Sequence, residues 1–357
     1  MRMTEHTLKQ AWHRIAAGSD LLDDAMFPPT GTSPDQYAGR AGDQDRLFLV
    51  LDEDGTVRGY HGPYRESFAS RDPDQVLYFV AEDAVRRLAE HIVAHSPGHG
   101  PVANLVTGQA GMLDRIDPAW GTRFRSGGVD GTPPAPPCGR DPLERLAWIA
   151  GSWREQDPYT NLLFFRGEGI SAEDIALLHG ADPEQTATGT RLSDLRSMDG
   201  TGRDYWDIAW ESLCFGQAGD WVFLMHHETP PGTRADSAAL SRLGVTETVQ
   251  LSACSAKAIY TFDHTRDGRR VDDDWGVLEL IWYERGRAPY YRGGQLDFLN
   301  RAVRRAELDH PEVTNEFELY FHALDTALGL QLPQQAIQDG SVRAAQWARA
   351  DKSGIGG

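Results

Sequence analysis

A stretch of glycine and proline divides the sequence into two parts. Residues 127–137 hold three glycines and four prolines and almost no large apolar side chain. This composition is typical of a semi-extended linker. A chain of 357 residues also exceeds the usual size of one domain. We therefore predict a first domain at 1–126, a linker at 127–141 and a second domain at 142–357.

Periodic apolar residues predict helices and a hairpin in the first domain. The expected elements are helices at about 8–15, 74–95 and 109–116 and strands at 47–51 and 56–60. The helical pattern is strongest in the second of these helices, where apolar side chains form one stripe and charged ones take the other side. Asp54-Gly55 predicts a tight turn between the two strands, because glycine supplies a positive φ.

Strand patterns dominate the second domain. The expected strands lie at 162–165, 206–215, 221–227, 248–255, 258–263 and 277–283. The expected helices lie at 142–153, 171–178 and 235–243, and a helical tail covers 296–305, 311–328 and 334–348. Short turns between neighbouring strands indicate antiparallel pairing. The predicted class is α+β, with two domains that each contain a mainly antiparallel sheet packed with helices, and with a C-terminal helical tail.

Charge and cysteine content argue against several classes of protein. The formal net charge is -18, of which residues 1–140 contribute -5 and residues 141–357 contribute -13. We expect no nucleic-acid partner, because phosphate binding requires clustered Lys and Arg. Cys138, Cys214 and Cys254 are too far apart in the sequence for a disulfide framework or a thiolate zinc site.

Targeting patterns are also missing. No segment approaches the about 20 apolar residues that a membrane-spanning helix requires. The N-terminal residues lack the apolar stretch and cleavage site of a signal peptide. We therefore expect a cytoplasmic protein without membrane contact.

A glycine pattern follows the strand expected at 162–165. Residues 167–172 (GEGISA) fit G-x-G-x-x-A between a strand and a helix, as in dinucleotide-binding proteins. That interpretation needs a second parallel strand ending in an acidic residue about 20 positions further on, and residues 181–205 contain no apolar run. A glycine turn followed by a helix that Ser171 and Asp174 cap explains the same pattern, so no cofactor is predicted.

Two groups of histidines resemble metal ligands but have unsuitable geometry. His226 and His227 are adjacent on an expected strand, so their side chains point to opposite faces of the sheet. His91, His95 and His99 are spaced by four residues, but the Pro-Gly pair before His99 ends the helix. No metal site is predicted.

No catalytic residue is predicted. The sequence has no Gly-x-Ser-x-Gly elbow and no cysteine–histidine signature. Ser252, Cys254 and Ser255 fall inside an expected strand. Because the chain has 53 acidic residues, no carboxylate pair stands out for acid–base catalysis. These patterns favour a binding protein over an enzyme.

Aromatic residues concentrate on the expected sheet of the second domain. They are Trp206, Trp210, Trp221, Trp275, Trp282, Tyr205 and Tyr283. Large aromatic side chains dominate both protein cores and binding hot spots. Either a core role or a partner surface fits them.

The first domain resembles a known family. Residues 75–85 (QVLYFVAEDAV), continuing to His91, and residues 112–120 (MLDRIDPAW) resemble the Immunity protein 63 family of bacterial polymorphic toxin systems. In that family a leucine-tyrosine pair opens a helix with a hydrophobic face, and the domain closes near Asp/Asn-Pro-x-Trp. The resemblance covers roughly residues 40–125.

The second domain is similar to an actinobacterial domain of unknown function. The matching stretches are 165–171 (FRGEGIS), 177–182 (LLHGAD), 219–222 (GDWV), Leu240-Ser241 and 262–268. They span about residues 143–330. The similarity implies a fold and a lineage, and neither resemblance carries over a catalytic residue.

The resemblance of the first domain implies a non-enzymatic immunity-type protein that binds and neutralises a cognate toxin. The acidic balance of the chain is compatible with a basic toxin. Asp272, Asp273, Asp274 and Trp275 are the candidate partner-binding residues, because they combine clustered negative charge with an aromatic anchor. The alternatives are a ligand-binding or scaffold protein and an enzyme of unrecognised type with an inter-domain site. The oligomeric state stays open.

Overall fold

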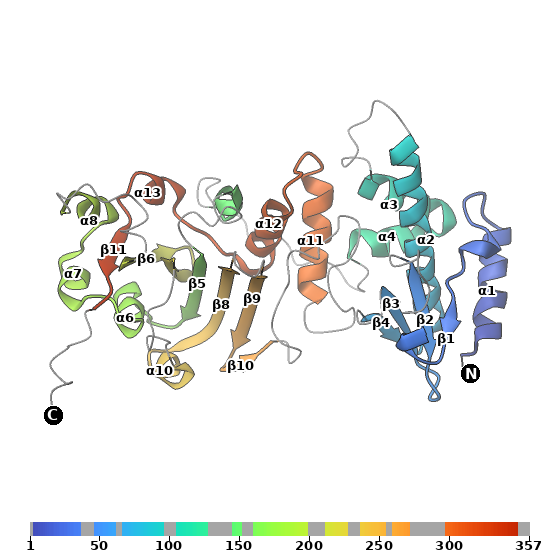
Figure 1. Cartoon of the computed structure of the whole chain (residues 1–357), viewed down its shortest axis with the longest axis horizontal. Coiled ribbons are helices and arrows are strands. Elements are labelled where there is room, and N and C mark those ends of the chain that lie inside the picture. The colour runs from blue at the N-terminus through green and yellow to red at the C-terminus, as the bar shows by residue number, and fades with distance from the viewer. Residues whose placement is uncertain are drawn as a thin grey trace. The chain divides into compact units, whose positions relative to one another are not determined.

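The computed structural model divides the chain into two compact units. Unit 1 comprises Met1–Pro134 and Tyr283–Leu319, and unit 2 comprises Ala135–Trp282 and Tyr320–Gly357. The structure describes residues 3–36, 46–61, 66–95, 105–127, 145–151, 160–198, 211–227, 236–254, 259–271 and 297–348. Figure 1 shows both units, with most of their helices and strands labelled.

Unit 1 combines a small sheet with helices. Its strands are β1 (Thr30–Gly31), β2 (Leu47–Leu51), β3 (Val57–His61) and β4 (Glu66–Ser70), in the order β1-β2-β3-β4. Its helices are α1 (Glu5–Ala17), α2 (Pro73–His95), α3 (Leu105–Ile116), α4 (Pro118–Arg125) and α11 (Asp297–Asp309), with short 3-10 turns at Asp24–Met26 and Pro34–Gln36. β1 pairs with β2 in parallel, and the other pairs are antiparallel.

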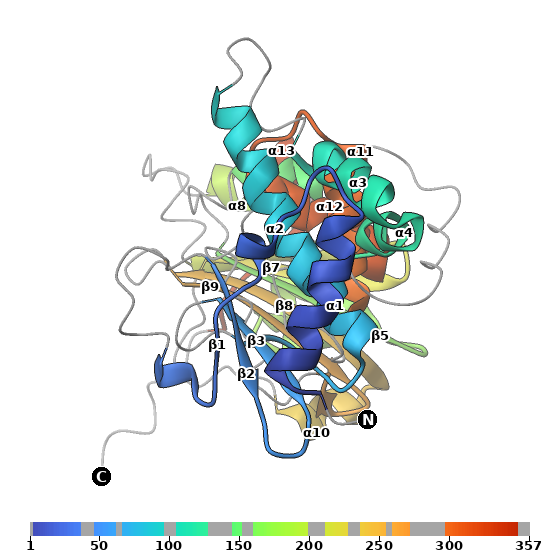
Figure 2. The ribbon, with the colours of Figure 1, turned by 90° about the vertical axis from the view of Figure 1, so that its right-hand side faces the viewer.

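The core of unit 1 forms around α2. Figure 2 shows α1 beside α2. Helix α2 also contacts α3 and β4. Apolar residues of α2 pack with Trp12 of α1, Phe68 of β4 and Trp120 of α4 in one buried cluster. Helix α2 is buried on nearly every side from Val76 to Arg86, so it is the central element of the unit.

Most elements of unit 1 lie where the sequence predicts them, within a few residues. β4 was not predicted, because Phe68 is its only large apolar side chain and its pairing with β3 stabilises it. α4 was also not predicted, although its start carries a clear signal. Asp117 caps the helix by accepting from the Ala119 amide, and Pro118 occupies its first turn.

Residues 283–319 belong to unit 1, whereas the sequence pattern placed them in the second domain. The reason is that α11 packs against α3 and α4. Its Arg304 is buried, lies 3.6 Å from the Glu82 carboxylate of α2 and covers the ring of Phe124 at 3.8 Å. Arg304 also lies 3.4 Å from the buried carboxylate of Glu307 on its own helix, so the ion pair with Glu82 adds to the apolar packing that holds α11 in the first unit.

Unit 2 is built on an antiparallel sheet, in which the described residues form seven strands in the order β10-β9-β8-β5-β7-β6-β11. The strands are β5 (Asn161–Gly167), β6 (Ser212–Ala218), β7 (Trp221–His226), β8 (Val245–Cys254), β9 (Ile259–Arg266), β10 (Arg269–Arg270) and β11 (Arg343–Gln346). The helices are α6 (Ala172–Leu178), α7 (Pro183–Thr188), α8 (Leu192–Met198), α10 (Ser237–Arg242), α13 (Gln334–Gln338) and the part of α12 (Glu316–Leu328) from Tyr320 onward, with a 3-10 turn at Ala147–Ile149.

Both faces of this sheet are covered. Phe164 and Phe165 are neighbours on β5 and point to opposite faces, and both are buried. Phe165 packs in a cluster with Ile175 of α6. On the opposite face Phe164 meets the ring of Trp221, whose indole N–H donates to the carbonyl of Leu328 at the end of α12 (3.0 Å). The predicted α+β class, with mainly antiparallel sheets and C-terminal helices, is confirmed.

The C-terminal tail differs from the prediction at its end. A helix was expected over 334–348, but the helix α13 ends at Gln338 and β11 follows it. Gly340 has a φ of 77°, which turns the chain. Ala344 then pairs with Cys214 of β6, and both are fully buried. Pairing with the sheet edge therefore overrides the helical propensity of these alanines.

Other expectations for unit 2 fall partly outside the described residues. These are the strand at 277–283, the start of the strand at 206–215 and the two ends of the helix at 142–153, whose described middle contains the 3-10 turn at Ala147–Ile149. Residues 183–198 form α7 and α8, which were not predicted because the segment lacks an apolar run. Within the described ranges, no helix combines the length and the apolar character that a membrane crossing demands.

Gly59 of β3 provides a test of the packing in unit 1. A Cβ atom there would lie 2.2 Å from Cε1 of Phe68, so Gly59→Ala forces this buried ring to move. We expect a destabilisation of about 1–3 kcal/mol, typical of overpacking, in urea unfolding followed by tryptophan fluorescence. The matched control is Gly111→Ala in α3, where a Cβ meets nothing within 4 Å and helix propensity predicts a gain of about 1 kcal/mol. Equal effects of the two substitutions would contradict this packing.

Candidate functional site

Helix α2 buries charged side chains in the middle of its apolar sequence. Glu82, Asp83 and Arg86 are all buried among the apolar residues of the unit 1 core. A buried charge is costly unless it is paired and hydrogen-bonded. The partners of these side chains therefore determine how the surrounding elements are placed.

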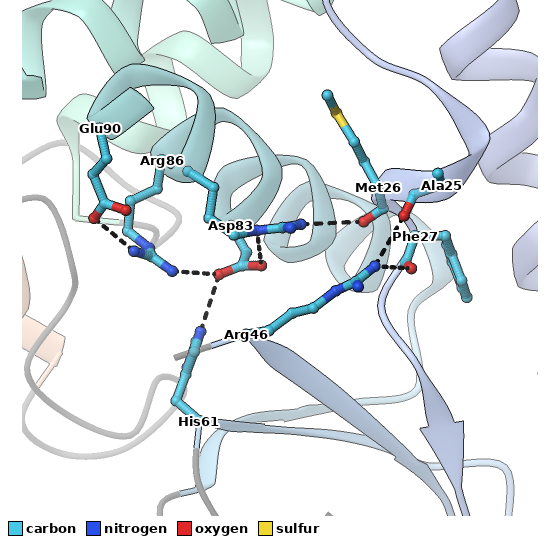
Figure 3. Close-up of polar contacts among 9 residues, drawn as sticks. Ala25, Met26, Phe27, Arg46, His61, Asp83, Arg86 and Glu90 are labelled. Atoms are coloured by element: carbon cyan, nitrogen blue, oxygen red, sulfur yellow. Dashed lines mark hydrogen bonds and ion pairs between the residues drawn. The ribbon is translucent and has the colours of Figure 1, made fainter. Parts of the chain in front are cut away.

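Asp83 is the centre of one such group (Figure 3). Its Oδ1 lies 3.0 Å from Nη2 of Arg86 and 3.3 Å from Nε2 of His61. Its Oδ2 lies 3.2 Å from Nε of Arg87. The arginines are one helical turn further along α2, and His61 ends β3, so a single carboxylate joins the helix to the sheet.

The cations around Asp83 keep it ionised. Burial by itself would raise the pKa of the Asp83 carboxyl. The hydrogen bond from His61 and the positive charges of Arg86 and Arg87 outweigh burial, and the pKa falls well below its ordinary 3.8. Asp83 is therefore a carboxylate, and only an acceptor, near neutral pH.

Guanidinium groups also bind the loop before the sheet. Arg87 donates to the carbonyl of Met26 (3.3 Å), and Arg46 donates to the carbonyls of Ala25 and Phe27 (both 2.9 Å), as Figure 3 shows. These bonds satisfy three successive backbone oxygens. The loop is thereby attached both to α2 and to the start of β2.

His61 also contacts a serine. Its Nδ1 lies 2.7 Å from Oγ of Ser67 on β4. Gly59 pairs with Phe68 and Tyr60 pairs with Glu66, so Ser67 is the extra residue of a β-bulge. Bulges redirect side chains and are frequent beside functional sites. The result is a hydrogen-bonded chain from Ser67 through His61 to Asp83, which we name the Ser67 relay.

With a neutral His61, the ionised state of Asp83 implies one arrangement of protons in the Ser67 relay. The carboxylate can only accept, so Nε2 of His61 carries the proton that is donated to it. In the neutral imidazole Nδ1 is then an acceptor, and the hydroxyl of Ser67 donates to Nδ1. A hydroxyl that donates to a histidine held by a carboxylate is the arrangement from which general-base chemistry proceeds.

Unit 2 contains a second buried carboxylate with the same types of partners. Oε1 of Glu247 lies 2.8 Å from both Nε2 of His264 and Nη2 of Arg266, and its Oε2 lies 2.9 Å from Nε of Arg166. Burial alone would raise the pKa of Glu247, but the hydrogen bonds from these groups lower it to about 2. The Arg166 guanidinium also covers the Trp221 ring at 4.5 Å.

The two centres differ in access to solvent. The side chain of His264 is 1% exposed, whereas that of His61 is 18% exposed. Ser67 is also partly exposed. The histidine of the Glu247 centre is therefore closed to solvent, although the arginines of that centre are partly exposed, and the Ser67 relay can be reached from solvent.

A third feature is a segment of unit 2 that is rich in acidic residues, of which Glu173 is ion-paired with Arg343. Residues 167–190, named here the acidic segment, contain no Lys or Arg. Its acidic residues are Glu168, Glu173, Asp174, Asp182 and Glu184. The segment carries Leu177, which is 40% exposed. A large exposed apolar side chain among carboxylates is a common feature of a protein-binding surface.

The partner-binding residues predicted from the sequence, Asp272, Asp273, Asp274 and Trp275, lie outside the described residues. Five other aromatic residues of the predicted cluster also lie outside the described residues: Tyr205, Trp206, Trp210, Trp282 and Tyr283. Trp221 is 1% exposed and is part of the core of unit 2.

The glycine pattern at 167–172 forms a turn, as expected. Gly169 has a φ of 70°, and Oγ of Ser171 accepts from the Asp174 amide (3.0 Å) to cap α6. The Asp174 carboxylate accepts from the Ser171 hydroxyl (2.7 Å) instead of from its backbone. β5 pairs antiparallel with both of its neighbours, so the parallel unit of a dinucleotide fold is not present at this position.

The histidines noted in the sequence form no set of metal ligands within the described residues, although the rings of His91 and His95 lie 4.2 Å apart. His226 and His227 are both buried, and the His226 ring packs edge-on against Trp347 at 5.5 Å. His91 and His95 lie on the exposed last turn of α2, and His99 lies outside the described residues. Across the described ranges, no group of three or more His, Cys, Asp or Glu residues has metal-binding geometry.

The remaining nucleophile candidates lie within the sheet of unit 2. Ser252 donates to Oδ1 of Asn161 (2.8 Å) on the neighbouring strand, which is a structural bond. Cys254 ends β8, and Ser255 lies outside the described residues. Cys214 is buried in β6.

Sequence patterns did not single out Ser67, His61 or Asp83. One signal was available, because Glu82 and Asp83 interrupt the apolar stripe of the strongest helix, and such charges need buried partners. The identity of those partners depends on tertiary contacts between residues 22 positions apart, and no local motif marks them.

No protein-family model matches this chain, and neither the curated proteins nor the solved structures contain a match to it. Structural evidence for a function therefore comes from the geometry of the described residues.

Asp83→Asn tests the charge at the centre of unit 1. Because the folded pKa of Asp83 is lowered, its contribution to stability is present above the unfolded pKa and is lost as the pH falls through the folded value. At pH 7 we expect Asp83→Asn to cost about 3 kcal/mol, since it leaves buried cations without their counter-charge. The difference from wild type should stay constant from pH 7 to 5 and shrink below about pH 4. Urea midpoints across this range check it.

The control for this experiment is Glu53→Gln in the exposed β2–β3 turn, which should change the midpoint little at any pH. A cost of Asp83→Asn that does not depend on pH would show that the charge of Asp83 does not stabilise the fold.

Proposed function

We propose that this chain is a cytoplasmic immunity-type protein that neutralises a basic toxin protein by binding it, without an enzymatic reaction on the toxin. The resemblance of residues 40–125 to the Immunity protein 63 family supports the proposal, as does the net charge of -18. The observation that carries it is the acidic segment with its exposed Leu177. Asp272, Asp273, Asp274 and Trp275 remain part of the proposed interface on sequence grounds.

The physical basis of the proposal is electrostatic steering combined with an apolar anchor. A field of one sign raises the association rate of an oppositely charged partner. Carboxylates at the rim of an interface contribute mainly to this rate, whereas a side chain that becomes fully desolvated contributes most of the affinity. In the acidic segment Glu168 and Glu184 are exposed and suit the first role, and Leu177 suits the second.

The test first searches the genes adjacent to that of this chain for a basic toxin domain and then uses that domain as the partner. Co-expression of the full chain should restore growth, and the purified proteins should form a stable complex. The double variant Glu168→Lys/Glu184→Lys should weaken the affinity about tenfold at low salt, mainly through slower association. Leu177→Asp should weaken it further and accelerate dissociation. Stopped-flow or surface plasmon resonance measurements separate the two rates.

The matched control reverses two exposed charges elsewhere. Glu53→Lys/Asp220→Lys makes the same change in net charge at residues outside the acidic segment. This control should retain nearly all of the affinity. If both double variants weaken binding equally, the acidic segment is not the interface, and if the toxin neither binds nor loses its toxicity, the proposed function is wrong.

A further inference from the structure

We propose that Ser67 is a nucleophile that hydrolyses esters, with His61 as its general base and Asp83 as the group that orients His61. The inference goes beyond toxin binding and does not depend on it. It rests on three observations: the geometry of the Ser67 relay, the proton positions that this geometry imposes, and the exposure of its serine end.

Asp83 is held in one orientation. Each of its oxygens accepts from an arginine, Arg86 at 3.0 Å and Arg87 at 3.2 Å. Arg86 is itself fixed by Glu90 (2.6 Å). A carboxylate that cannot rotate keeps the imidazole of His61 in one tautomer and one orientation, which is the role of the acidic residue in serine hydrolases.

Among the serine hydroxyls of β4, only that of Ser67 has a base as its partner. Ser70 lies on the same strand, but it is buried and donates to Oε1 of Gln75 (2.5 Å). Ser67 instead lies 2.7 Å from Nδ1 of His61, within the range required for proton transfer. The bulge at Ser67 produces this difference, because it turns the side chain away from the regular alternation of the strand.

The position of Ser67 allows a substrate to approach. β4 is the last strand in the described order of its sheet, and both Ser67 and His61 are partly exposed. The equivalent histidine of unit 2, His264, is fully buried beside Glu247. A substrate can therefore reach the relay of unit 1 but not the centre of unit 2.

The proposed reaction has two steps. First, Oγ of Ser67 forms a bond to the carbonyl carbon of the ester while its proton moves to Nδ1 of His61. The bond to the leaving oxygen breaks, and that oxygen takes the proton from His61. Then a water molecule attacks the acyl carbon and gives one proton to His61, the bond from Ser67 to the acyl group breaks, and Oγ takes this proton back as the acid leaves.

The charges around Asp83 restrict the class of ester. The imidazolium that forms on His61 is stabilised by a carboxylate whose charge Arg86 and Arg87 already share. This stabilisation is weaker than that of an unshared aspartate. The site therefore suits esters with a stabilised leaving group, such as aryl esters and thioesters, more than amides.

A fluorophosphonate probe tests the proposal on the full chain. Oγ of Ser67 should displace fluoride from phosphorus while His61 takes the hydroxyl proton, and peptide mass spectrometry should locate one adduct on Ser67. Ser67→Ala should lose the adduct, and His61→Gln should slow its formation about 100-fold. Ser70→Ala, which removes a neighbouring hydroxyl outside the relay, should be labelled like wild type. The rates at which the variants hydrolyse p-nitrophenyl acetate should follow the same order as their rates of labelling.

Circular dichroism establishes that each variant is folded, and Ser67→Ala removes only one oxygen, so its fold is the least perturbed. Failure of the folded wild-type chain to form an adduct overturns the proposal. An adduct that persists in Ser67→Ala, or a rate that His61→Gln leaves unchanged, also overturns it. None of these outcomes affects toxin binding, whose test uses a different surface and a different readout.

Discussion

The pairing of the buried Asp83 carboxylate is the interaction on which unit 1 depends. The carboxylate sits on the central helix α2 and would cost several kcal/mol if it were buried without counter-charges. Its partners are His61, at the end of β3, and Arg86 and Arg87 one turn along α2. Because Arg87 also binds the Met26 carbonyl, one negative charge determines where a strand, a helix and a loop meet. Apolar packing around α2 excludes water from these ion pairs and strengthens them.

The buried carboxylates of Glu247 and Asp83 have the same types of partners, but the two centres differ in access to solvent. Glu247 and Asp83 each bind one histidine and two arginines, and both pKa values are lowered although burial opposes this. Around Glu247 the residues lie in register on three adjacent strands, since Arg166 pairs with Glu247 and Glu247 with Arg266. That centre joins three strands around a buried carboxylate and a buried histidine. Around Asp83 a bulged edge strand leaves one side of the histidine accessible to solvent, and this is what makes chemistry possible there.

The sequence predicts the framework of the protein better than its candidate site. Apolar periodicity places α2, and Asp54-Gly55 places the β2–β3 turn, because both signals are local. The strand at Arg343–Gln346 was missed, since its alanines favour a helix until β6 offers a partner. The Ser67 relay was missed for a related reason. Its residues form no spaced motif, and the bulge that directs Ser67 toward His61 is a property of strand register, which a sequence pattern does not specify.

An ionised Asp83 should set the proton positions of both His61 and Ser67, and these positions can be measured directly. The measurement is a long-range ¹H–¹⁵N correlation spectrum of the ¹⁵N-histidine-labelled full chain above pH 7, with His61 assigned through His61→Gln. We predict a neutral imidazole whose Nε2 carries the proton and whose Nδ1 has the shift of a hydrogen-bond acceptor, which Ser67→Ala should alter. A proton on Nδ1 with an unprotonated Nε2 would contradict this assignment, because Ser67 would then be an acceptor and the carboxylate would face a lone pair.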